Sequence, residues 1–199
     1  MDRPATLRPP LTETEVADAE RTLGVRFPAD YRRYLCGPDV HGFGVVRTEH
    51  GWRWPGDDTL RADLLSEPFP HPDSYLEADA ALVDREPREA DFDDPAGFTA
   101  SWKAWDEECE EFEDRRTAGA MRLQEHGCGF STLLVVSGPL AGTMWWDGRA
   151  SCDLIVPLRL DPAGDGPPVT FGQWLGRNSW DLLPSQAHPR YAGEQQGRL

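Results

Sequence analysis

The chain has 199 residues, with 20 Lys and Arg against 35 Asp and Glu, which gives a formal net charge of −15 at pH 7. This length is enough for one domain with a sizeable hydrophobic core, and a hydrophobic content of 39% excludes a disordered chain. The negative charge disfavours a nucleic acid or an anionic membrane as the partner, because both would repel the protein.

The lack of a recognisable targeting signal and the spacing of the cysteines favour a cytoplasmic protein. Residues 1–10 contain three prolines and no apolar run, so they do not resemble a secretory signal. No stretch approaches the roughly 18 apolar residues of a membrane-spanning helix. The cysteines are widely spaced, without a CxxC pair, and we expect free, buried thiols. They are Cys36, Cys109, Cys128 and Cys152.

The N-terminal region predicts a pair of helices. Thr12, followed three residues later by Glu15, forms a capping box that starts the first helix, and Gly24 supplies its left-handed end. Pro28 predicts the start of a second, short helix that ends at Gly37.

The next part of the chain predicts little regular structure. Residues 41–70 contain turns and short strands, one of them near residues 45–47. Residues 68–97 are acidic and rich in proline, which indicates an irregular surface segment with at most one short helix, near residues 75–83.

A long helix is predicted next, because apolar residues recur at steps of three or four and Arg116 alone interrupts them. We expect this helix to end near His126 and Gly127, with its aromatic stripe forming a buried face. The stripe consists of Trp102, Trp105, Cys109 and Phe112, followed by Ala120 and Leu123.

Three strands and a last helix follow. Residues 132–136, 143–146 and 154–158 are apolar and separated by Pro- and Gly-containing turns, which is typical of an antiparallel meander. Thr170 is placed to cap the closing helix. The order of elements predicts an α+β fold, in which an antiparallel-rich sheet has helices packed on it.

We expect one domain over residues 1–183, with an acidic insertion at about 68–124 that contains the long helix, and a polar tail over 184–199. Trp145 and Trp146 are adjacent on a predicted strand and therefore face opposite sides of the sheet. One belongs in the core, and the other is either covered by a helix or exposed.

Motifs of catalysis are absent from the sequence, which contains no GxSxG, HExxH or phosphate-binding loop. Isolated pairs of reactive residues lack the further ligands or partners that a zinc site, a nucleophile or a calcium loop needs. These pairs are His126 with Cys128, Cys36 with His41, Asp57 with Asp58, and Asp93 with Asp94. We therefore expect a binding protein and not an enzyme, with no catalytic residue, metal or cofactor.

The negative charge is concentrated in one segment. Residues 73–114 contain 16 acids and three bases, a net charge of −13, whereas the other 157 residues have a net charge of −2. The segment is either a solvated surface that aids solubility or a binding surface for a basic partner, whose association the charge would steer. The candidate partner-binding residues are Glu107, Glu110, Glu111 and Asp114 on the helix, with Asp91, Asp93 and Asp94 before it.

Residues 11–35 combine an acidic helix ending in Leu23–Gly24, an apolar residue followed by Pro28, and Asp30–Tyr31 followed by an aromatic residue and Leu35. This combination resembles the opening of the SUKH superfamily, which includes the yeast cell-wall assembly regulator and many bacterial proteins. Further matching segments are the Gly-rich turn at 41–44, the strands at 127–136 and 142–147, and the helix at 170–175. Residues 51–124 match no part of the family pattern.

The resemblance implies an α+β domain that binds a protein partner. Bacterial members are widely immunity proteins that neutralise polymorphic toxins, many of them nucleases, by binding and not by catalysis. We therefore expect an immunity protein whose acidic face meets a basic toxin. The alternatives are a regulatory scaffold of the yeast-regulator type, with several weak partners, and an uncharacterised hydrolase.

Overall fold

The computed structural model describes residues 9–38, 42–54, 56, 60–152 and 154–184. In this part of the chain helices lie beside antiparallel strands, which confirms the predicted α+β class. None of these helices is both long enough and apolar enough to cross a bilayer. The helices are α1 (Glu13–Leu23), α2 (Ala29–Leu35), α3 (Leu76–Asp84), α4 (Pro95–Arg115), α5 (Arg149–Cys152) and α6 (Phe171–Trp174), with 3-10 turns at Ala62–Leu64, Pro72–Ser74, Glu89–Asp91 and Ser179–Leu182.

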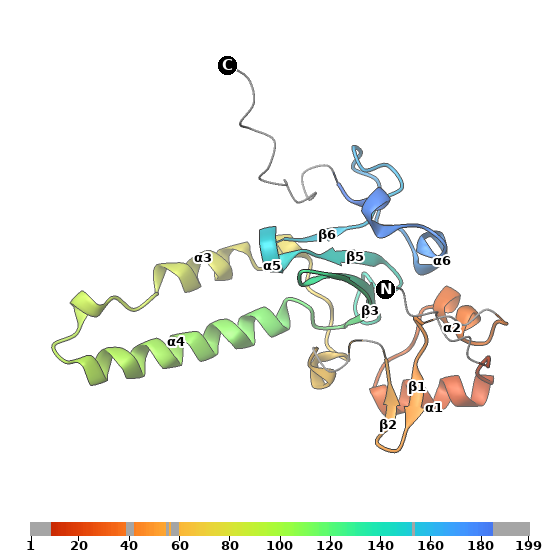
Figure 1. The fold of residues 1–199 in the computed structure, drawn as a ribbon, viewed down its shortest axis with the longest axis horizontal. Coiled ribbons are helices and arrows are strands. Elements are labelled where there is room, and N and C mark those ends of the chain that lie inside the picture. The colour runs from red at the N-terminus through yellow and green to blue at the C-terminus, as the bar shows by residue number, and fades with distance from the viewer. Residues whose placement is uncertain (1–8, 39–41, 55, 57–59, 153, 185–199) are drawn as a thin grey trace.

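The main sheet has four antiparallel strands in the order β3-β4-β5-β6, so each strand pairs with its neighbour in sequence (Figure 1). The three predicted strands are confirmed as β4, β5 and β6, and a smaller hairpin pairs β1 with β2. The strands are β1 (Val46–Thr48), β2 (Gly51–Arg53), β3 (Ala120–Gly127), β4 (Phe130–Val135), β5 (Met144–Asp147) and β6 (Ile155–Pro157).

The N-terminal helix pair forms as its capping signals predict. The Thr12 hydroxyl accepts a hydrogen bond from the backbone N–H of Glu15 (3.2 Å), and the Glu15 carboxylate accepts one from the backbone N–H of Thr12 (2.8 Å). Gly24 ends α1 with φ at +70°, and Pro28 precedes α2. Because Val16 is fully buried, α1 is fixed against the body of the protein by its apolar face.

Two cores lie on opposite faces of the main sheet. Trp146 belongs to the larger core, which α1, α2 and α6 cover. Trp145 belongs to the smaller one, where its ring lies 5.2 Å from that of Phe69 and close to Leu133. Both indoles are buried. The sequence predicted that the second indole is either exposed or covered by a helix, but Trp145 is neither. The loop that carries Phe69 covers it instead.

The prediction that the helix with the aromatic stripe ends near residue 126 is wrong. α4 starts at Pro95, because the Asp94 carboxylate caps it by accepting a hydrogen bond from the N–H of Gly97 (2.8 Å). It stops at Arg115, and Ala120 begins β3, the edge strand beside β4. The apolar residues of β3 continue the helical spacing by coincidence, since the chain turns between the two elements.

α3 and α4 form a helical hairpin that projects from the body, on the left in Figure 1. We call α3, the turn at Glu89–Asp91 and α4 the arm. Within the arm's helices only Leu82 is buried, and α4 has no buried residue at all. Phe69 and Ala120 also lie inside the segment 68–124, but both belong to the smaller core, so only the arm leaves the body.

Gly119 sits where the chain passes from the arm into the sheet. Its φ is +67°, and a Cβ there would lie 2.3 Å from the carbonyl oxygen of Glu67. We expect Gly119→Ala to lower the free energy of unfolding by about 3 kcal/mol or more, because backbone strain of about 1–3 kcal/mol adds to the clash. Urea denaturation measures the loss.

Gly176→Ala is the matched control, because Gly176 has φ at +81° but nothing within 4 Å of an added Cβ. Its loss should therefore reflect only strain, about 1–2 kcal/mol. Equal losses in the two variants would contradict the close approach of the chain at Gly119.

Candidate functional site

A network of buried charges joins the base of the arm to the sheet. The Arg149 guanidinium forms a bidentate pair with the Asp147 carboxylate (2.9 Å for each bond) and donates from Nη1 to the carbonyl oxygen and carboxylate of Glu113 (2.6 and 2.9 Å). Arg116 donates to the second carboxylate oxygen of Glu113 (2.7 Å). We call these four residues the root network. Because Asp147 ends β5 and Glu113 lies in the last turn of α4, the network sets the direction of the arm.

Burial and hydrogen bonding oppose one another at Arg149. Its side chain is 18% exposed and that of Asp147 is 5% exposed. Burial disfavours the cation, but the bonds to Asp147 and Glu113 outweigh this, so the pKa of Arg149 is raised. Arg149 is therefore held as a cation by the carboxylates that surround it.

The start of α3 is attached to the same base. The ring of Tyr75 meets that of Phe112 edge-on at 6.0 Å, and the guanidinium carbon of Arg116 lies 5.0 Å from the centre of the Tyr75 ring. Burial raises the pKa of the Tyr75 hydroxyl. The two helices are thus held together by aromatic and cation–π contacts where the arm leaves the body.

Two further contacts hold the hairpin along its length. The indole N–H of Trp105 donates to the carbonyl oxygen of Leu82 (2.9 Å), near the end of α3. Arg85 pairs with both carboxylate oxygens of Glu108 (3.0 and 2.8 Å), and this bond lowers the pKa of Glu108. The stripe that we expected to be buried is therefore a half-buried seam between two helices.

Two of the predicted partner-binding residues form ion pairs with arginines of the same chain. Arg61, from the loop before the arm, donates to Glu111 (3.0 Å) and Asp114 (3.4 Å). Arg115 also donates to Glu111 (2.9 Å) and to Glu67 (3.1 Å). The hydrogen bond from Arg61 lowers the pKa of Glu111. Glu111 and Asp114 are therefore paired with arginines of the chain, although their side chains remain 43% and 42% exposed, and their role in binding a partner stays a prediction.

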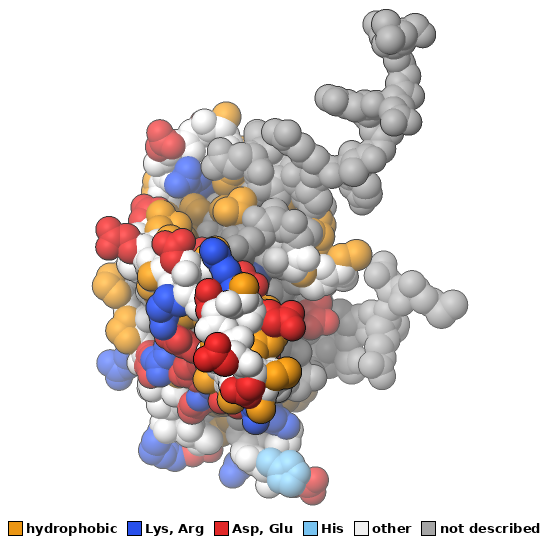
Figure 2. Space-filling view, turned by 90° about the vertical axis from the view of Figure 1, so that its left-hand side faces the viewer, with side chains coloured by type: hydrophobic (Ala, Val, Ile, Leu, Met, Phe, Trp, Pro, Cys, Tyr) orange, Lys and Arg blue, Asp and Glu red, His pale blue; other side chains and the backbone are white. Residues whose placement is uncertain are grey.

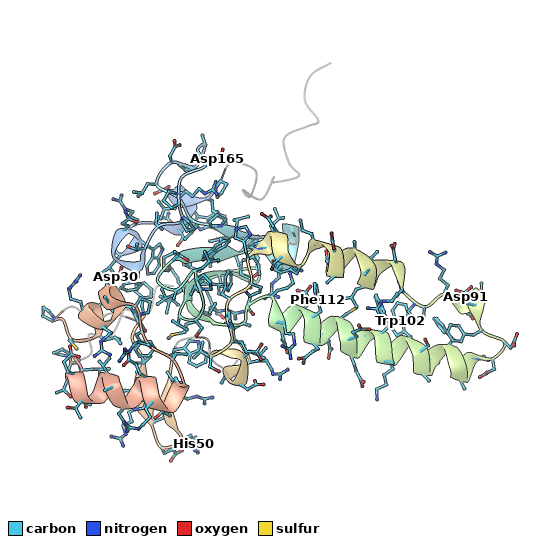
Figure 3. The ribbon with its side chains drawn as sticks, turned by 180° about the vertical axis from the view of Figure 1, so that it is seen from behind. Asp30, His50, Asp91, Trp102, Phe112 and Asp165 are labelled. Atoms are coloured by element: carbon cyan, nitrogen blue, oxygen red, sulfur yellow. The ribbon has the colours of Figure 1, made fainter. Side chains whose placement is uncertain are left out.

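The other predicted residues lie farther out. Glu107 is 3.6 Å from the ammonium of Lys103, Asp91 lies at the far end of the arm, and Asp94 caps α4 (Figure 3). Together with Glu110 and Asp93, they do not meet at a single point but spread over the arm. What they share is a position beyond the reach of the arginines of the body.

Most carboxylates of the outer arm form no ion pair within the described residues. They are distributed over α3, the connecting segment and α4. We call them the outer carboxylates: Asp84, Glu86, Glu89, Asp91, Asp93, Asp106 and Glu110. Figure 2, which views the molecule from the side on which the arm projects, shows acidic and hydrophobic side chains intermingled there. The unbalanced charge of the chain is thus displayed at the end that projects into solvent.

A row of aromatic rings accompanies these charges. The ring centres of Phe92, Phe98, Trp102 and Trp105 follow one another at 5.8, 6.0 and 5.2 Å. None of the four is buried, and Trp102 is 39% exposed. We call them the aromatic row. The sequence indicated this row, because its stripe contains more aromatic side chains than two helices with almost no core between them can bury.

The catalytic alternatives find little support in the geometry. His126 donates or accepts through Nε2 at Thr132 Oγ1 (2.8 Å), and Thr132 in turn contacts Ser179 Oγ (2.8 Å), but Thr132 and Ser179 are buried. Trp174 donates to Ser179 as well (2.8 Å). Thr132 and Ser179 lie beneath the surface, and only His126 at the end of this chain of hydrogen bonds is partly exposed. The evident role of these hydrogen bonds is to satisfy buried polar atoms.

The thiols are unlike activated nucleophiles. Burial raises the pKa values of Cys36 and Cys109, which opposes formation of the thiolate. Cys36, Cys109 and Cys128 are free, as expected, but Cys128 is exposed in the β3–β4 turn and the other two are only partly buried, so the expectation of buried thiols is wrong for all three. The side chain of Cys152 lies outside the described residues, as does the proposed partner His41.

Metal and ligand sites give no better candidate. The described residues contain no group of three or more His, Cys, Asp or Glu side chains able to hold a metal, and Asp57 and Asp58 lie outside them. A shallow surface depression of about 260 Å³ lies along β3 and is lined by Gly56 and residues 122–125. Compared with these candidates, the arm is the strongest candidate for a functional surface.

No model of a protein family, no curated protein and no solved structure matches the chain.

The root network generates a stability prediction. Arg149→Met leaves the buried Asp147 carboxylate without its cation, so we expect the free energy of unfolding to fall by about 3–5 kcal/mol. Arg85→Met is the control, since it removes an equally bidentate pair whose partners are both more than half exposed. Its cost should be at most about 1 kcal/mol. Similar costs in chemical denaturation would show that the root network does not anchor the arm.

His126 generates a prediction about pH. Burial lowers its pKa, so the unfolded chain binds a proton more readily than the folded protein does. Stability from this group is therefore complete above the ordinary pKa of about 6.5 and is lost as the pH falls below it, with a slope of at most about 1.4 kcal/mol per pH unit. Denaturation of wild type and His126→Gln between pH 7 and pH 5 measures this loss.

We expect the wild type to lose stability more steeply than His126→Gln over this range. Carboxylates that titrate at the lower end contribute equally to both proteins and cancel in the comparison. His50→Gln, at an exposed position, should behave as wild type. Parallel curves for wild type and His126→Gln would refute the prediction.

Proposed function

We propose that the chain is a non-catalytic binding protein whose arm recognises a basic partner protein, and that it acts in the cytoplasm as an immunity protein against a toxin. The observation that carries the proposal is the construction of the arm. It is held at its base by the root network, yet at its outer end it displays unpaired carboxylates and a partly exposed aromatic row, in which Trp102 is 39% exposed.

Electrostatics and packing both support this role. The segment 73–114 has a net charge of −13, and within the described residues Arg61 of the body pairs with it only near its inner end, at Glu111 and Asp114. A solubility surface needs charge but no exposed tryptophan, whereas tryptophan is enriched among the residues that dominate binding energies. The resemblance to the SUKH superfamily points in the same direction, since its bacterial members widely act by occluding a toxin. A basic nuclease would fit the charge of the arm.

The experiment is co-purification with the product of the adjacent gene, followed by measurement of the association rate at low salt. We expect Asp106→Asn/Glu110→Gln to slow association several-fold, because complementary charge raises the rate of encounter. The loss should vanish at high salt, where exposed charges are screened.

The matched control is Glu49→Gln/Asp165→Asn, which removes two exposed carboxylates from the body. It should leave the rate within about twofold of wild type, since distant charges contribute little across a Debye length of about 10 Å. Equal effects of the two double variants would contradict a role for the arm. Recovery of several weak partners and no tight one would favour the scaffold alternative.

A further inference from the structure

The aromatic row is only partly covered, because α3 is shorter than α4. α3 ends at Asp84, and its contacts with α4 reach only Trp105 and Glu108. The first turns of α4 therefore have no helix facing them and are accompanied by the connecting segment that carries Phe92. Trp102 lies in this outer half, between Phe112 near the body and Asp91 at the far end (Figure 3).

The row has the dimensions of a helix-binding surface. Phe98, Trp102 and Trp105 are spaced four and three residues apart, so they lie along one side of α4 over two turns, about 10 Å at 1.5 Å per residue. A helix whose apolar residues recur at the same steps presents a stripe of matching length. In an extended strand the side chains alternate between two faces, so only every second residue of a bound strand would contact the row.

The surrounding charge selects among possible occupants. The outer carboxylates lie around the row, at the end of α3, on the connecting segment and on α4, and no arginine of the body pairs with them within the described residues. A second copy of the chain would bring two such segments together, and their like charges would repel. A positively charged helix would instead neutralise the outer carboxylates while it covered the rings.

We propose that the aromatic row is the docking site for a basic, amphipathic α-helix of the partner protein, with Trp102 as its central contact. This inference rests on the proposed function and specifies what part of the partner the arm receives. The apolar side of the helix packs on Phe98, Trp102 and Trp105, and its lysines and arginines face carboxylates such as Asp106 and Glu110.

The test uses the full chain and an 18-residue peptide of leucine and lysine, with leucines spaced three and four residues apart. Peptides of the same composition in scrambled order, and with glutamate in place of lysine, are the controls. We expect the amphipathic basic peptide to bind in titration calorimetry at physiological salt. The scrambled peptide should bind at least about tenfold more weakly, and the acidic one should not bind.

Variants of the arm locate the site. Trp102→Gln, which keeps a good helix former, should weaken binding about tenfold or more, and Trp102→Phe should keep most of it. Leu160→Gln, at a residue of the body that is 54% exposed, should have no effect. Circular dichroism confirms that each variant keeps its helices. Quenching of wild-type tryptophan fluorescence by acrylamide provides a measurement without a variant, because a bound helix should shield Trp102.

The outcomes separate this inference from the proposed function. Binding of the scrambled peptide as tightly as the amphipathic one, or of Trp102→Gln as tightly as wild type, would overturn the docking site. So would a dimer of the free chain that Trp102→Gln abolishes, because the occupant would then be a second copy. If the product of the adjacent gene binds wild type and Trp102→Gln equally, the inference fails while the proposed function stands.

Discussion

The bidentate pair between Arg149 and Asp147 is the contact on which the rest of the arm depends. Asp147 is the last residue of β5, and Arg149 carries its charge from there to Glu113 at the end of α4. Arg116 completes the network from the next turn. Because Asp147, Arg149 and Arg116 are largely buried, each is costly without its partners, and this dependence fixes a hairpin that has almost no core of its own.

The same arrangement divides the carboxylates of the arm into two populations. Those nearest the body, such as Glu111 and Asp114, are balanced by Arg61 and Arg115 and serve to position the helix. Farther out, Arg85 and Lys103 of the arm pair with Glu108 and Glu107, and in the described part of the chain the outer carboxylates have no ion-pair partner. The charge of the chain is therefore best understood as a local property of a projecting, rigidly based hairpin. The aromatic row lies at the same place. Its rings can contribute binding affinity, while the charge steers the association of a partner.

Much of the fold could be predicted from the sequence, because it depends on local signals: the capping box at Thr12 and the β-branched strands of the meander are examples. The errors arose where local and distant information conflict. Ala120 and Leu123 continue a helical spacing, and only the contacts of the sheet make them a strand. The charge of the segment follows directly from the sequence. The pairing of Glu111 with Arg61 does not, because Arg61 lies 50 residues away and the residues around Glu111 give no indication of that partner.

The central claim is that the outer arm, and not the sheet or its helices, receives the partner. Hydrogen exchange of the chain, free and in complex with the product of the adjacent gene, tests this most directly, since it reports protection along the whole backbone. We predict that protection on binding is concentrated in residues 86–110, at the outer end of the arm. Protection confined to the body, with exchange in the arm unchanged, would contradict the claim.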